Sequence, residues 1–129
     1  MIAVDTSALV AVLANEPLAE QCEAVLLPSA LLMSAATFTE CLIVGARPEF
    51  HGRMRGLIEQ LVIEIIPVSE EFAELAASAH LRWGKGRHPA RLNYGDCFSY
   101  ALAEFYDCPL LYVGNDFSQT DIRSALASA

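Results

Sequence analysis

Four acidic residues stand at the edges of apolar segments, where a charged side chain is costly to bury; they are Asp5, Glu40, Asp96 and Asp116. A buried carboxylate needs a counter-charge or a metal ion, or it takes up a proton. If the fold gathers the four acids, their mutual repulsion favours a hard divalent cation such as Mg²⁺ or Mn²⁺, which oxygen ligands suit. A site of this kind could hydrolyse a phosphodiester, because the ion activates a water and stabilises charge on the phosphate.

Each acid taken alone also has a simpler structural explanation. Residues 37–40, Thr-Phe-Thr-Glu, match a capping box, and residues 93–96 place Asp96 at the third position of a helix, where the macrodipole favours a negative charge. Asp5 and Asp116 could cap a helix or a turn. The four together favour a shared site, because parallel sheets collect ligands beyond the carboxyl ends of their strands.

Hydroxyl groups lie next to two of these acids. Thr6 and Ser7 follow Asp5, and Ser118 lies two residues after Asp116. Their oxygens could orient a water or a phosphate, and they could equally well serve as ordinary caps of helices and turns.

A basic segment precedes Asp96. The net charge of −8 argues weakly against nucleic-acid binding, but seven of the eight Lys and Arg residues lie between positions 47 and 91. Lys85, Arg87 and Arg91 could hold the phosphates of a nucleic-acid strand. The same loop could simply be solvated, and composition alone leaves the two interpretations open.

The elements that would position these residues alternate along the chain. Short apolar runs predict strands at residues 1–4, 31–34, 62–66 and 109–113. Periodic patterns and capping signals predict helices at residues 7–13, 18–26, 37–44, 50–60, 70–83 and 93–106. This alternation predicts an α/β fold around a mostly parallel sheet, and the length of 129 residues predicts one domain.

Cysteine usage and hydropathy limit the classes of protein and the cellular location that we expect. The four Cys residues lack C-x-x-C spacing, so we expect buried thiols rather than a disulfide framework or a zinc site. The N-terminus does not have the pattern of a signal peptide. The longest uncharged run is too short to span a bilayer, which needs about 20 residues. We therefore expect a cytoplasmic protein with no membrane contact.

Four segments carry a resemblance to a known family. They are Val4-Asp5-Thr6-Ser7-Ala8-Leu9, then Thr39-Glu40, then the stretch of residues 92–103, and last Gly114-Asn115-Asp116-Phe117-Ser118-Gln119-Thr120-Asp121-Ile122. In this order they resemble the PIN-domain proteins, and specifically the VapC-type toxin ribonucleases of type II toxin–antitoxin systems. The first two motifs are weak alone; the last two are specific, and the similarity spans nearly the whole chain.

The resemblance implies a PIN-like three-layer α/β/α sandwich. It also implies that Asp5, Glu40, Asp96 and Asp116 bind Mg²⁺ or Mn²⁺ and that the protein is an endoribonuclease. It implies a homodimer and neutralisation by a VapB-type antitoxin. Asp121 is a second acid in the last motif; a turn cap is the favoured role, and metal binding stays open.

Three other functions compete with this one. An acidic binding module without catalysis would use the apolar surface for a protein partner. A receiver domain would need a second acid beside Asp5 and a Lys after the last strand, where Gly114 and Asn115 stand instead. A zinc hydrolase is disfavoured because the three His residues lack ligand spacing.

Overall fold

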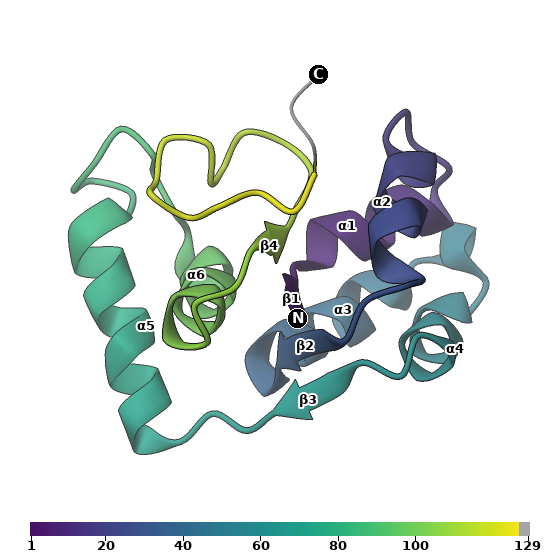
Figure 1. Cartoon of the computed structure of the whole chain (residues 1–129), viewed down its shortest axis with the longest axis horizontal. Helices are drawn as coiled ribbons and strands as arrows, with labels where there is room; N and C mark the ends of the chain where they lie inside the picture. The colour runs from purple at the N-terminus through teal and green to yellow at the C-terminus, as the bar shows by residue number, and fades with distance from the viewer. Residues whose placement is uncertain (127–129) are drawn as a thin grey trace.

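A parallel sheet forms the centre of the structure, a computed structural model that describes residues 1–126 (Figure 1). Its strand order is β3-β2-β1-β4, and its strands are β1 (Ile2–Val4), β2 (Leu31–Ser34), β3 (Glu64–Ile66) and β4 (Leu110–Leu111). All three pairings are parallel, and Ala3 of β1 lies opposite both Leu32 and Leu110. Strands β2 and β4 are buried along their whole length and β1 at all but its first residue, which explains their continuous apolar sequence.

Helices cover both faces of this sheet. They are α1 (Thr6–Leu13), α2 (Ala19–Leu26), α3 (Ala35–Gly45), α4 (Arg53–Gln60), α5 (Glu70–Trp83) and α6 (Tyr94–Phe105), with a short 3₁₀ helix η1 at Pro48–Phe50. Figure 1 shows α5 and α6 on one side of the strands and α1 to α4 on the other. The expected three-layer α/β/α sandwich is therefore confirmed.

Each face of the sheet has its own apolar core. Ala3 packs with buried residues of α5 and α6, including Phe72 and Leu102. Its neighbour Val4 packs on the other face of the sheet, with Leu9 of α1 and with buried residues of α2, α3 and α4. This alternation follows from the two-residue period of a strand. All four cysteines are free and buried within these layers, as expected.

Most element boundaries lie within two residues of the sequence prediction, and three elements differ in other ways. The helix expected at residues 50–60 is broken at His51 and Gly52, which both have positive φ angles of 50° and 69°. The strand expected from Val62 begins only at Glu64, because Val62 has a φ of 54° and is 82% exposed. The last strand shrinks to two residues. None of the helices in the described part of the chain is long and apolar enough to cross a bilayer.

Candidate active site

The carboxyl end of β1 leads directly into Asp5, the N-cap of α1. Asp5 Oδ2 accepts hydrogen bonds from the backbone N–H of Ser7 at 3.1 Å and from Ser7 Oγ at 2.6 Å. Ser7 Oγ also accepts a bond from the Val113 N–H at 3.0 Å, which joins α1 to the segment after β4. Asp5 therefore caps α1, as its sequence position allowed, and Ser7 holds the carboxylate in place.

Asp96 occupies the first turn of α6 and is only 9% exposed. It forms a reciprocal capping box with Asn93: Asp96 Oδ2 accepts from the Asn93 N–H at 3.0 Å, and Asn93 Oδ1 accepts from the Asp96 N–H at 2.8 Å. Burial, helped by the nearby charges of Asp5, Asp116 and Glu40 and opposed by the Asn93 hydrogen bond, raises the pKa of Asp96 to about 7. The fold therefore places Asp5, Glu40 and Asp116 within electrostatic reach of Asp96.

Glu40 reaches this group from α3, but not from the position that its sequence predicts. The N-cap of α3 is Ser34, whose Oγ accepts from the Thr37 N–H at 3.0 Å. The helix start predicted at Thr37 is therefore wrong, and the alternative explanation of Glu40 by a capping box is excluded, because Glu40 is the sixth residue of the helix. Its Oε1 accepts a short hydrogen bond from Thr6 Oγ1. Its Oε2 would lie 2.9 Å from a Cβ atom placed on Gly95, so the glycine leaves room for this carboxylate beside α6.

Asp116 lies in the loop after β4 and is exposed. The chain turns into this loop at Gly114, whose φ of 104° suits only a glycine. Ser118 Oγ donates to the Asn115 carbonyl at 2.8 Å and so closes the turn around Asp116. Of the three hydroxyl residues singled out in the sequence, Ser7 and Thr6 bond to acids and Ser118 bonds to backbone.

A buried chain of hydroxyl groups behind Asp5 was missed by the sequence analysis. Ser99 Oγ of α6 donates to Asp5 Oδ1 at 2.6 Å. Ser99 in turn lies 3.3 Å from Thr37 Oγ1, which accepts from Ser34 Oγ at 3.1 Å. The available signal was a Ser three residues after Asp96 inside an otherwise apolar helix; such a residue needs a buried partner.

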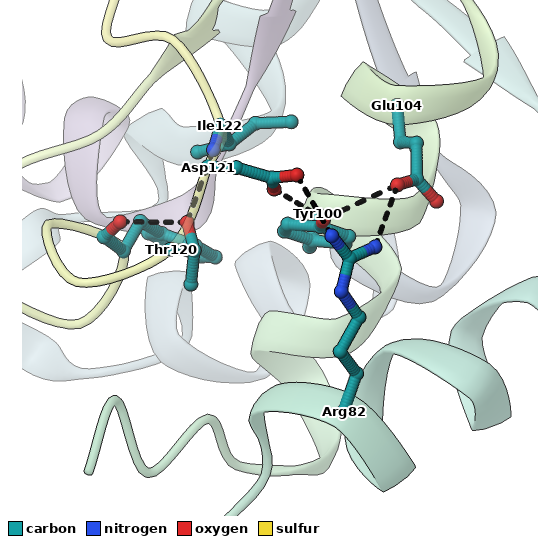
Figure 2. Close-up of polar contacts among 7 residues, drawn as sticks. Arg82, Tyr100, Glu104, Thr120, Asp121 and Ile122 are labelled. Atoms are coloured by element: carbon teal, nitrogen blue, oxygen red, sulfur yellow. Dashed lines mark hydrogen bonds and ion pairs between the residues drawn. The ribbon is translucent and has the colours of Figure 1, made fainter. Parts of the chain in front are cut away.

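Asp121 does not cap a turn with its side chain. Its carboxylate accepts from the Tyr100 hydroxyl and, at 3.0 Å, from Arg82 Nη2, as Figure 2 shows. The structure thus commits Asp121 to partners on α5 and α6 rather than to the acids around Asp96.

The donor set suits a hard divalent cation. It consists of carboxylate oxygens, and none of the four acids forms an ion pair within residues 1–126, where every ion pair uses other acids. In the same residues, no three Asp, Glu, His or Cys side chains already stand at ligand spacing. Hydrogen bonds hold Asp5, Glu40 and Asp96 separately, so metal binding would need a change in the conformation of these side chains.

The basic loop lies between α5 and α6. Two backbone hydrogen bonds close its base, from the Lys85 N–H to the Leu92 carbonyl at 3.0 Å and from the Leu92 N–H to the Trp83 carbonyl at 3.1 Å. Lys85, Arg87 and Arg91 are all exposed and line an open hollow. The loop ends two residues before Tyr94 starts α6.

Comparison with known proteins identifies the family. The profile of the PIN domain matches residues 2–123. Ribonuclease VapC30 of Mycobacterium tuberculosis is 45% identical over 125 residues, which cover 94% of this chain and 95% of that protein. The fold is similar to the crystal structure of Mycobacterium tuberculosis VapC20, a sarcin-ricin loop cleaving toxin, with a TM-score of 0.77 and 18% identity over 98% of this chain and 100% of that one. It is also similar to a toxin–antitoxin complex from Klebsiella pneumoniae, with a TM-score of 0.71 and 19% identity over 94% of this chain and 93% of that one. The chain therefore belongs to the PIN-domain family, and within it to the VapC ribonucleases.

Proposed function

We propose that this protein is a metal-dependent endoribonuclease and the toxin of a VapBC-type pair, with Asp5, Glu40, Asp96 and Asp116 as the catalytic and metal-binding residues. The observation that carries this proposal is the buried Asp96 carboxylate, which lies within electrostatic reach of three other acids, none of them in an ion pair within residues 1–126. Keeping such a group ionised near neutral pH requires a nearby positive charge, and a bound Mg²⁺ or Mn²⁺ would supply it.

The chain's own residues would orient the reacting groups. A bound divalent ion supplies an activated water and neutralises charge on the scissile phosphate. Ser7 and Ser99 hold the two oxygens of Asp5, and Asn93 holds Oδ2 of Asp96. These hydrogen bonds restrain Asp5 and Asp96 before the substrate arrives, which limits the reorganisation that metal and substrate binding would require.

RNA would approach across the basic loop. Lys85, Arg87 and Arg91 are exposed and could neutralise backbone phosphates without reading sequence. Tyr94 is 79% exposed at the start of α6, and its ring packs edge-on against Phe98 with 5.1 Å between centroids. A ring held in this way can stack on a base of a single strand.

The partners follow from the same reasoning. An acidic site attracts a basic protein segment, and an Arg can pair with a carboxylate through two hydrogen bonds. We propose a VapB-type antitoxin that uses such a segment, in keeping with the structurally similar toxin–antitoxin complex. We further propose a homodimer, acting in the cytoplasm on cellular RNA.

The proposal is tested with purified protein and a broad RNA pool. Protein supplied with Mn²⁺ should cleave RNA at internal positions, and the same protein in EDTA should not. Equal cleavage in the two conditions would contradict the metal-dependent mechanism. An acidic module that only binds a protein partner would bind no Mn²⁺ in a calorimetric titration and would leave the RNA intact.

A further inference from the structure

One acid of the last motif, Asp121, bonds to two neighbouring helices. Asp121 Oδ1 accepts from the hydroxyl of Tyr100 on α6, and Asp121 Oδ2 accepts from Arg82 on α5 (Figure 2). Arg82 also pairs with Glu104 at 3.5 Å and lies over the Trp83 ring at 4.9 Å. Asp121 therefore joins the loop after β4 to both helices of one layer.

Tyr100 gives this junction its rigidity. The residue is 1% exposed, so its hydroxyl needs a partner inside the protein, and a carboxylate is a strong one. Tyr100 lies four residues after Asp96 on α6. The same helix thus carries one acid of the site and the anchor point for the loop that carries another.

The loop that Asp121 anchors holds Asp116 only through its backbone. Between the two acids, Phe117 is buried and packs against Tyr112, with 5.1 Å between ring centroids. Thr120 Oγ1 donates to the Phe117 carbonyl at 2.7 Å and accepts from the Ile122 N–H at 3.2 Å. These contacts make residues 117–122 a compact unit, while the Asp116 side chain itself is exposed.

We infer that Asp121 is a positioning residue: through Tyr100 and Arg82 it fixes the loop of residues 114–121 so that Asp116 stays beside the other three acids. Asp121 is not itself a metal ligand in this arrangement. The inference rests on the proposed function, because it requires Asp116 to contribute to metal binding. Mutation of a residue that orients a metal ligand typically lowers metal affinity or activity by about 10- to 100-fold.

The test measures Mn²⁺ affinity by calorimetry on metal-free protein, together with kcat and KM for one cleaved RNA oligonucleotide. Asp121→Asn should raise the Kd for Mn²⁺ by about tenfold and lower kcat with little change in the KM for RNA. Tyr100→Phe, which removes the hydroxyl and keeps the ring, should give the same direction of change. Glu104→Gln is the matched control, because Glu104 touches Tyr100 and Arg82 but not the loop; it should stay within about twofold of wild type.

A double variant separates positioning from direct binding. If Asp121 acts through Asp116, Asp116→Asn with Asp121→Asn should bind Mn²⁺ no more weakly than Asp116→Asn alone. Amide hydrogen exchange at residues 114–120 should speed up in Asp121→Asn and not in Glu104→Gln.

Two results would overturn the inference. One is an unchanged Kd and unchanged exchange in Asp121→Asn; the other is a double variant whose affinity losses add, which would make Asp121 an independent ligand. Asp116→Asn reports separately on the proposed function. If that variant alone binds Mn²⁺ like wild type, the assignment of Asp116 is wrong, whatever Asp121 does.

Discussion

Asp96 shows how one side chain can serve both the fold and the site. Its Oδ2 closes the capping box with Asn93, and its other oxygen is left for a ligand. Burial of Asp96 makes its negative charge costly in the absence of a cation, and the charges of the nearby acids add to this cost. The ionised form of Asp96 is therefore destabilised in metal-free protein.

The cost of ionising the buried Asp96 predicts that the stability of the metal-free protein depends on pH. The folded-state pKa of about 7 lies above the ordinary value of 3.8, so the folded protein binds the proton more tightly than the unfolded chain does. The contribution of Asp96 to stability is then present below about pH 4 and is lost as the pH rises to about 7; at about 1.4 kcal/mol per pKa unit it amounts to about 4 kcal/mol at most. Asp96→Asn should weaken Mn²⁺ binding and activity, and remove this loss.

Thermal melts of metal-free wild type and Asp96→Asn at pH 5 and pH 8 check the prediction. The Tm difference between the two proteins should change with pH, in favour of the variant at pH 8. Glu20→Gln, at an exposed position of α2, serves as the control for loss of one negative charge. A pH-independent difference, or an Asp96→Asn enzyme with full activity, would contradict the role given to Asp96.

Gly95 offers a second test at the level of single atoms. A methyl group there would lie 2.9 Å from Glu40 Oε2 and would push that carboxylate away, whereas Gly56 of α4 has no atom within 4 Å of the same position. Both changes to Ala should maintain or raise stability, by up to about 1 kcal/mol, because Ala favours the helix. Only Gly95→Ala should weaken Mn²⁺ binding and lower kcat.

Chemical denaturation and Mn²⁺ calorimetry on the two glycine variants give the comparison. Equal metal affinity in Gly95→Ala and Gly56→Ala would remove Glu40 from the site, because the added methyl group must displace its side chain.

Among the elements, those with unambiguous end signals were predicted best. The bounds of α5 match the sequence prediction, since Ser69 caps the helix, Glu70 and Glu71 follow, and Gly84 ends it. Strand β2 also matches at both ends. In these segments local capping, hydrophobic pattern and burial all favour the same boundaries.

Predictions failed where two local signals competed. Ser34 and Thr37 can each cap a helix, and the choice of Ser34 moved Glu40 one turn into α3. The partner of Glu40 is Thr6, which is 34 residues away in the chain and gives no local signal. The same holds for Ser99 and Asp5, which are separated by 94 residues. The four acids and the helix ends with a single capping signal could thus be predicted, whereas the start of α3 and the hydroxyl partners of the acids could not.

The loop between α5 and α6 should act as an electrostatic element. Lys85→Ala with Arg87→Ala should weaken RNA binding and reduce the slope of log affinity against log salt by about two, about one for each lost phosphate contact. Arg53→Ala with Arg55→Ala is the matched control, because these two exposed Arg residues lie on α4, on the other side of the sheet. Asp96→Asn protein, which the proposed site predicts to be inactive, allows binding to be measured without cleavage. A slope that falls equally in both pairs would leave the loop without a specific role.

At the scale of the whole molecule, large apolar side chains remain on the surface. Leu27, Ile43, Val62, Leu81 and Phe105 are each more than half exposed. Charged residues make up only 19% of the sequence, so little charge separates these side chains. Apolar area of this kind is commonly covered by a partner, and a twofold homodimer is the commonest closed arrangement.

The proposed dimer predicts a mass of about twice 14.0 kDa in solution. Light scattering at micromolar protein, in low and in high salt, should report this mass in both, since apolar contacts are not weakened by screening. Leu81→Lys, at an exposed position of α5, should favour the monomer if that helix forms the interface. Leu27→Lys, at the end of α2, should favour the monomer only if the interface includes that end. A single 14.0 kDa species for the wild type would reject the dimer.

Net charge and site chemistry together predict competition between the antitoxin and the metal. The net charge is −8, and the acids around Asp96 lack a basic partner among residues 1–126. An Arg from the antitoxin would place a positive charge where the divalent ion otherwise binds, so each should weaken the binding of the other by the same factor. Antitoxin affinity should therefore fall as the Mg²⁺ concentration rises. Ionic strength is held constant with Na⁺ in buffers without Ca²⁺, so that screening does not change during the titration. Asp96→Asn toxin, with a weakened metal site, should show a smaller dependence on Mg²⁺. An affinity that stays constant across the Mg²⁺ titration would mean that the antitoxin leaves the four acids uncovered.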